Sequence, residues 1–131
     1  MGPIGYLLDT HTLLWAIGSP DLLPHRTRKL IEDPETRLWV SSASVWEMAT
    51  KHRLGRLPEA GPLLADVGHY VQRLGADTLA ISVEHARLAG SFPNTHRDPF
   101  DRMLAAQSIL EHLPLMTSDG AFDDFPADVV R

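Results

Sequence analysis

The sequence has no cysteine. This absence excludes disulfides, zinc sites built on thiolates, iron–sulfur clusters and cysteine nucleophiles. Histidine and carboxylate side chains are left as the candidate metal ligands. A chain without disulfides also fits a reducing compartment, so we expect a cytoplasmic protein.

Basic residues and a long apolar run are both missing from the N-terminal segment, residues 1–9. Its apolar stretch is too short for a signal sequence or a membrane span, which predicts a soluble, intracellular protein without a membrane partner. The whole chain also has no excess of positive charge, because its 17 acidic residues outnumber its 12 Lys and Arg and give a net charge of −5. Bulk charge alone is therefore not expected to hold nucleic acid. A nuclease still fits, since bound divalent cations reverse the local sign of a carboxylate cage.

The sequence contains no internal repeat and no linker-like stretch. Its length of 131 residues suits one domain, which we expect to span residues 1–131. Short apolar runs alternate with amphipathic segments, which is typical of an α/β sandwich with a parallel sheet of about five strands. We expect strands buried on both faces at residues 6–8, 38–40, 79–81, 115–116 and 129–130. We expect helices at residues 12–18, 25–32, 44–54, 62–74, 83–89 and 98–111.

Four acidic residues lie just after predicted strands or near the starts of predicted helices: Asp9, Glu47, Asp101 and Asp119. Ligands of open parallel sheets bind beyond the carboxyl ends of the strands, so the four side chains are expected to converge on one crevice. Clustered carboxylates repel one another unless a cation neutralises them. An all-oxygen ligand set favours Mg²⁺ or Mn²⁺. The spacing therefore predicts a metal site.

Each acid also has an ordinary structural explanation. The segment from Ser44 to Glu47 matches a capping box, in which the glutamate accepts from the N-cap amide. Asp98 followed by proline matches an N-cap and first helical position, which makes Asp101 a favourable acid in the first turn. The two aspartates that follow strands could each cap a turn. Only the joint placement of the four acids favours a metal site over these explanations.

The order of the motifs resembles the PIN domain nucleases, and within them the VapC-type toxins of bacterial toxin–antitoxin pairs. The matching segments are LLDTH at 7–11 with LLW at 13–15, SSASVWE at 41–47 with Lys51, HRDPFDRMLAAQ at 96–107 and TSD at 117–119. The resemblance implies a PIN-like fold and an endoribonuclease that hydrolyses RNA phosphodiester bonds with one or two Mg²⁺ or Mn²⁺ ions. Asp9, Glu47 and Asp101 match the core acids of that site, and Asp119 matches a fourth, more variable position. It also implies a homodimer and a VapB-like antitoxin partner.

Polar residues beside the acids are secondary candidates for contacts to metal, water or phosphate: Thr10, His11, His96, Asp98, Arg102, Thr117 and Ser118. Hydroxyls at such junctions usually cap helices, and the arginine could equally hold a neighbouring carboxylate. Basic clusters at 25–29, 51–56 and 96–97 are expected to be solvated, or to guide an RNA backbone where they border the crevice. The three tryptophans are most simply packing residues.

Two other functions stay open. Residues 9–12, Asp-Thr-His-Thr, are faintly similar to the Asp-x-Asp-x-Thr loop of haloacid-dehalogenase-like phosphatases, in which Asp9 would be the nucleophile. The second aspartate of that loop is missing, and no lysine follows Lys51. The chain could also be a non-catalytic RNA-binding or protein-binding module that keeps a PIN-like fold.

Overall fold

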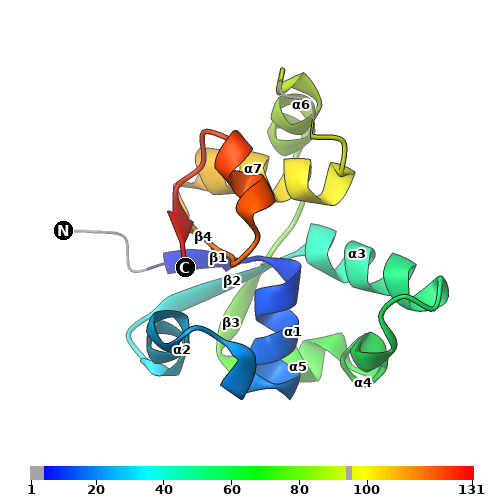
Figure 1. Cartoon of the computed structure of the whole chain (residues 1–131), viewed down its shortest axis with the longest axis vertical. Helices are drawn as coiled ribbons and strands as arrows, with labels where there is room; N and C mark the ends of the chain where they lie inside the picture. Colours follow the sequence, from blue (N-terminus) through cyan, green and yellow to red (C-terminus); the bar gives the residue numbers. More distant parts are fainter. Residues whose placement is uncertain (1–4, 94–95) are drawn as a thin grey trace.

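A parallel sheet runs through the middle of the molecule (Figure 1). The computed structural model describes residues 5–93 and 96–131. Within these residues the strands are β1 (Gly5–Leu8), β2 (Arg37–Ser41), β3 (Ala76–Leu79), β4 (Leu115–Met116) and β5 (Val129–Val130). Their spatial order is β3-β2-β1-β4-β5, and every neighbouring pair is parallel. The α/β fold with a parallel sheet of five strands is confirmed.

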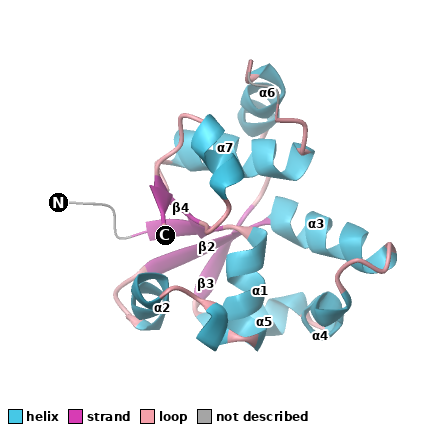
Figure 2. Ribbon diagram, in the orientation of Figure 1, coloured by secondary structure: helices cyan, strands magenta, loops and turns pink. Residues whose placement is uncertain are grey.

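Helices cover both faces of this sheet (Figure 2). They are α1 (Thr10–Gly18), α2 (His25–Glu32), α3 (Ser42–Arg53), α4 (Gly61–Ala65), α5 (Val67–Leu74), α6 (Val83–Ser91) and α7 (Pro99–Glu111). Helices α1, α2 and α5 lie on one side of the strands, and α7 lies on the other side with α6 packed against it (Figure 1). No helix in the described part of the chain is long and apolar enough to cross a membrane.

Neighbouring residues of β1 divide the hydrophobic core between the two faces of the sheet. Leu8 packs with residues of α1, α3 and α5, whereas Leu7 packs with residues of α6 and α7. Both leucines are fully buried, as expected where successive strand side chains point to opposite faces. The order of the strands also turns at β1, with β2 and β3 on one side and β4 and β5 on the other. Ligands bind open α/β sheets at such a turning point, beyond the carboxyl ends of the strands.

The third strand differs from its prediction. We expected it at residues 79–81, but β3 is Ala76–Leu79 and pairs with β2 in the register Leu38↔Ala76. Because β3 is an edge strand, Asp77 and Thr78 are exposed, and the prediction that every strand is buried on both faces is wrong here. This strand is not an apolar run, so a search for apolar runs does not find it. The prediction instead selected the more apolar residues at 79–81.

Several helix boundaries also differ, and capping explains them. Helix α1 begins at Thr10 because Asp9 accepts a hydrogen bond from the backbone of residue 11 as its N-cap. Helix α3 begins two residues early because Ser41 is its N-cap, so the capping box proposed from Ser44 to Glu47 is wrong. The single helix predicted at 62–74 is two helices that break at residue 66, the N-cap of α5. The predicted N-cap of α7, residue 98, and the acid in its first turn, residue 101, are confirmed.

Candidate active site

Asp9 lies where the central strand β1 ends, and the protein engages both of its carboxylate oxygens. Oδ1 accepts from the backbone amide of His11 at 2.7 Å, and Oδ2 accepts from the hydroxyl of Thr117, which directly follows β4. The residue is only 6% exposed. Burial raises the pKa of Asp9, while the hydrogen bonds from Thr117 and His11 oppose the rise. The strand end therefore holds a carboxylate in an environment that disfavours its charge.

Glu47 is the buried acid of α3, about one and a half turns from the start of the helix. Its Oε1 accepts from the Thr10 hydroxyl at 2.6 Å, and its Oε2 contacts the ammonium of Lys51, one turn further along. One hydroxyl hydrogen cannot serve two acceptors, so Ser44, whose Oγ lies 3.1 Å from Thr10 Oγ1, donates to Thr10. Repulsion from Glu47 also contributes to the raised pKa of Asp9, which shows that the two acids interact.

Asp101 lies in the first turn of α7 and is largely buried. Its Oδ2 is 2.8 Å from Nε2 of His96. Burial raises the pKa of Asp101 to about 6; the hydrogen bond from His96 opposes the rise, and repulsion from Asp98 and Glu47 adds to it. Glu47 is therefore within electrostatic range of both Asp9 and Asp101.

Lys51 supplies the positive charge nearest to Glu47. Burial acts to lower the pKa of Lys51, but the hydrogen bond with Glu47 and attraction to Glu47, Asp98 and Asp101 outweigh it and raise the pKa. The ammonium thus offsets part of the repulsion among the acids. The sequence places Lys51 in a basic cluster that we expected to be solvated or to guide RNA, and its pairing with Glu47 was not predicted. Its position four residues after Glu47 on one helix is the signal that could have predicted the pair.

Asp119 follows β4 and is the N-cap of the short 3₁₀ helix at Gly120–Asp124. Its carboxylate is exposed and accepts from the amide of Ala121 at 2.9 Å, while its own amide donates to Thr117 Oγ1 at 2.9 Å. A cavity of about 330 Å³ is lined by Asp9, His11, Thr12, Trp15, Ser118 and Asp119. The structure therefore brings Asp119 to a cavity shared with Asp9, and the other two acids do not line that cavity.

Of the secondary candidates, Thr10 and Thr117 contact carboxylates directly, as described above. Arg102 donates to three backbone carbonyls, those of Ala89, Phe92 and His96, at 2.7–2.9 Å. Through these bonds the arginine joins the end of α6 to the segment before α7, and so supports the element that carries the acid of α7.

Among the three tryptophans, Trp46 contradicts the expectation of a packing residue. It is 58% exposed on α3, immediately before Glu47. Its ring meets that of Phe100 edge to face, with the ring centres 4.8 Å apart. Trp15 and Trp39 are half-buried, in agreement with packing roles.

The donor chemistry of the three buried acids fits a hard divalent cation, since every ligand atom would be a carboxylate oxygen. As the side chains are placed, no three histidine, aspartate or glutamate residues in the described ranges are close enough to hold one ion. The acids are held instead by the chain's own groups, with Lys51 on Glu47, His96 on Asp101 and Thr117 on Asp9.

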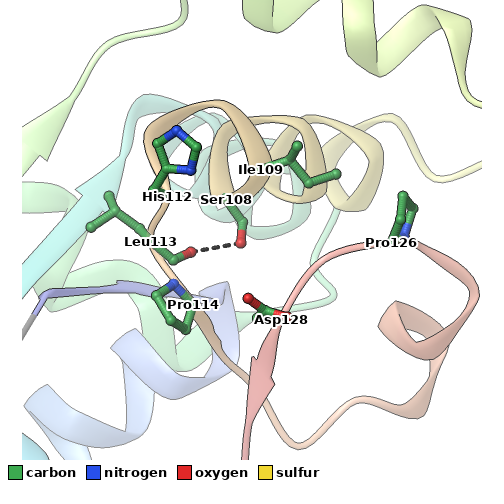
Figure 3. Close-up of a pocket in the computed structure, with 7 residues that line it drawn as sticks. All are labelled: Ser108, Ile109, His112, Leu113, Pro114, Pro126 and Asp128. Carbon is green, nitrogen blue, oxygen red and sulfur yellow. Dashed lines mark hydrogen bonds between the residues drawn. The ribbon is translucent and has the colours of Figure 1, made fainter. Parts of the chain in front are cut away.

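A second cavity, of about 440 Å³, lies at the opposite end of α7 from Asp101 and contains none of the four acids (Figure 3). Its lining residues are Ser108, Ile109, His112, Leu113, Pro114, Pro126 and Asp128. The Ser108 hydroxyl donates to the Leu113 carbonyl at 2.6 Å, so part of the polar lining is already bonded within the chain. Size alone therefore does not identify the functional site, and the chemistry favours the carboxyl ends of the strands.

Comparison with known proteins identifies the family. Residues 6–128 match the model of the PIN domain. Ribonuclease VapC16 of Mycobacterium tuberculosis is 32% identical in an alignment of 92 residues, and the match covers 60% of this chain and 65% of that relative's length. The crystal structure of VapBC2 from Rickettsia felis bound to a DNA fragment from their promoter contains a chain that matches with a TM-score of 0.69 and 18% identity, over 97% of both chains. That structure supports the fold, and the family model covers nearly the whole chain, so this chain belongs to the PIN domain family.

Proposed function

We propose that this protein is a divalent-metal-dependent endoribonuclease that hydrolyses RNA phosphodiester bonds as the toxin of a VapBC-type pair. The observation that carries the proposal is the placement of three acids on three separate elements: Asp9 and Glu47 are buried, Asp101 is partly buried, and the charge of Glu47 raises the pKa of both aspartates. Membership in the PIN domain family and a relative named as a ribonuclease support it.

In this proposal Asp9, Glu47 and Asp101 are the ligands of Mg²⁺ or Mn²⁺, and Asp119 is a fourth, peripheral acid. An ion held by these acids would supply a more acidic water for attack on phosphorus and would neutralise charge on the leaving oxygen. The hydroxyls of Thr10 and Thr117 fix the directions of two carboxylates. As placed, the acids are too far apart for three of them to hold one ion, so binding requires their side chains to move closer together.

The proposal also names partners and a setting. RNA is the substrate, a VapB-like antitoxin is the inhibitor, and the toxin pairs as a homodimer in the cytoplasm. We further propose that residues 1–131 form a single PIN domain, supported by the range of the family match and by one continuous sheet. The phosphatase alternative loses its support, because the position of its second aspartate is occupied by His11 and the chain belongs to another family.

A cleavage assay tests the proposal. The parent protein should cut RNA with Mg²⁺ or Mn²⁺ and stop in EDTA, and Asp9→Asn and Asp101→Asn should fold and lose cleavage. Asp119→Asn should lose less of the cleavage activity. Asp77→Asn, which alters an exposed carboxylate on the edge strand, should cleave RNA like the parent. Absence of metal-dependent cleavage by the folded parent would favour the non-catalytic module instead.

A further inference from the structure

An aromatic pair bridges the two helices that carry Glu47 and Asp101. Trp46 of α3 directly precedes Glu47, and Phe100 of α7 directly precedes Asp101. The two rings meet edge to face, with an interplanar angle of 80°. More than half of Trp46 is nevertheless exposed, although its neighbour Glu47 is almost completely buried. The pair therefore presents an exposed aromatic surface on the two helices that carry Glu47 and Asp101.

The aromatic pair lies next in sequence to two of the acids proposed to hold the metal ion at the reacting phosphate. Adjacent Cα atoms are about 3.8 Å apart, so each ring begins within one residue of an acid. A nucleobase that rests on Trp46 would thus belong to a nucleotide near the one held at the acids. The contact with Phe100 fixes the indole ring in advance, so little side-chain freedom is lost when a base stacks on it.

Two exposed arginines lie close in sequence to the aromatic pair. Arg53 lies two turns after Trp46 on α3, at the spacing that places side chains on one helix face. Arg97 lies three residues before Phe100. Both arginines are exposed, and within the described residues neither forms an ion pair. An aromatic ring flanked by cations that have no carboxylate partner matches the chemistry of a single nucleic-acid strand, with bases that stack and phosphates that attract cations.

We propose that Trp46, fixed by Phe100, is the stacking platform for one unpaired base of the RNA beside the cleaved bond. This inference rests on the proposed ribonuclease function and adds a residue that positions one base of the substrate. Bases inside an A-form duplex are stacked on each other and cannot reach such a platform. Trp46 is then a specificity-determining residue, whereas the acids carry the reaction.

The test pairs a change in the protein with a change in the RNA. The cut position in a single-stranded oligoribonucleotide is first mapped with the parent, and abasic sites are then placed one at a time around it. We expect one abasic position to lower kcat/KM of the parent by about 5- to 150-fold, the range for loss of one stacked base. Trp46→Ala should show a similar loss on intact RNA and almost no further loss at that abasic position. Trp46→Phe should retain most of the activity.

Leu22→Ala is the matched control, because Leu22 is 59% exposed and lies beyond the far end of α1, away from Asp9. It should cut intact and abasic RNA like the parent. Equal losses for Trp46→Ala on intact RNA and on every abasic RNA would overturn the platform, and so would unchanged cleavage by this variant. In the latter case, a Trp46→Ala defect confined to binding of a protein partner would assign the surface to that partner.

A binding measurement separates failure of the platform from failure of the proposed function. In the Asp9→Asn background, which should leave RNA intact, single-stranded RNA should quench tryptophan fluorescence, and Trp46→Phe should remove most of that quenching. Duplex RNA of the same sequence should quench much less. A parent that binds and quenches but never cuts would refute the ribonuclease and keep the platform. A parent that cuts without quenching at Trp46 would refute the platform alone.

Discussion

Replacing Asp101 by asparagine should stabilise the protein when no divalent metal is present. The folded structure raises the pKa of this carboxyl from its ordinary 3.8 to about 6, mainly through burial. Each pKa unit corresponds to about 1.36 kcal/mol, so a rise of about two units makes ionised Asp101 cost roughly 3 kcal/mol of folding free energy. Asparagine has nearly the same shape and no charge, and therefore avoids this cost.

The sign of the effect follows from proton binding. Because the pKa is higher in the folded state, the folded protein holds this proton more tightly than the unfolded chain between about pH 4 and pH 6. The stability of the parent should therefore fall as the pH rises through that window, and the whole penalty should be present above it. Two effects reduce the stability gained by Asp101→Asn: the side chain is 14% exposed, so solvent screens its charge, and the substitution removes the attraction to His96. We expect a net gain of about 1–3 kcal/mol for Asp101→Asn at pH 7.5.

Urea unfolding in EDTA at pH 4 and pH 7.5 measures this gain. Asp101→Asn should unfold at higher urea than the parent at pH 7.5, and the two should nearly coincide at pH 4. Asp77→Asn, the same chemical change at an exposed position, should follow the parent at both pH values. A variant no more stable than the parent at pH 7.5, or equally favoured at both pH values, would refute the reasoning.

Three further substitutions test how the acids are held. Lys51→Met should leave Glu47 buried without its cation and destabilise the metal-free protein by roughly 3 kcal/mol, measured by urea unfolding in EDTA; Mn²⁺ should recover much of this loss. Thr117→Val removes the hydroxyl bonded to Asp9, so it should cost about 1.5–3 kcal/mol in the same assay and raise the pKa of Asp9 further, as followed by carboxyl-carbon NMR. Arg102→Lys keeps the charge but cannot reach three carbonyls, so unfolding should show a loss of about 2 kcal/mol and hydrogen exchange should speed up near the start of α7.

Much of the fold follows from local patterns, because the inner strands and most helices have strong ones. Leu7 and Leu8, both fully buried, mark a strand whose two faces each contribute to a core. The edge strand β3 was misplaced because an exposed Asp77 pairs through its backbone, and backbone pairing leaves no apolar signal. The helix break at Asp66 also escaped prediction, since only its capping of α5 distinguishes it from a helical residue.

The candidate site was predicted in its acids but not in its supporting groups. Asp9, Glu47 and Asp101 lie beyond strand ends or near helix starts, and topology brings such positions together. The donors to them come from distant parts of the chain, as with Thr117, which is 108 residues from Asp9. Such partners depend on strand order, which the sequence does not express locally. The exposure of Trp46 was missed for a similar reason, because it depends on how α3 packs against α7.

Binding of Mn²⁺ to the folded protein decides whether the three buried acids form one cage. Titration calorimetry should show binding to the parent, and each of Asp9→Asn, Glu47→Gln and Asp101→Asn should weaken it by more than about tenfold, since even residues that only support a ligand contribute that much. Asp77→Asn should bind like the parent. If all three variants bound Mn²⁺ with the affinity of the parent, the acids would not be its ligands, and the proposed nuclease site would be wrong.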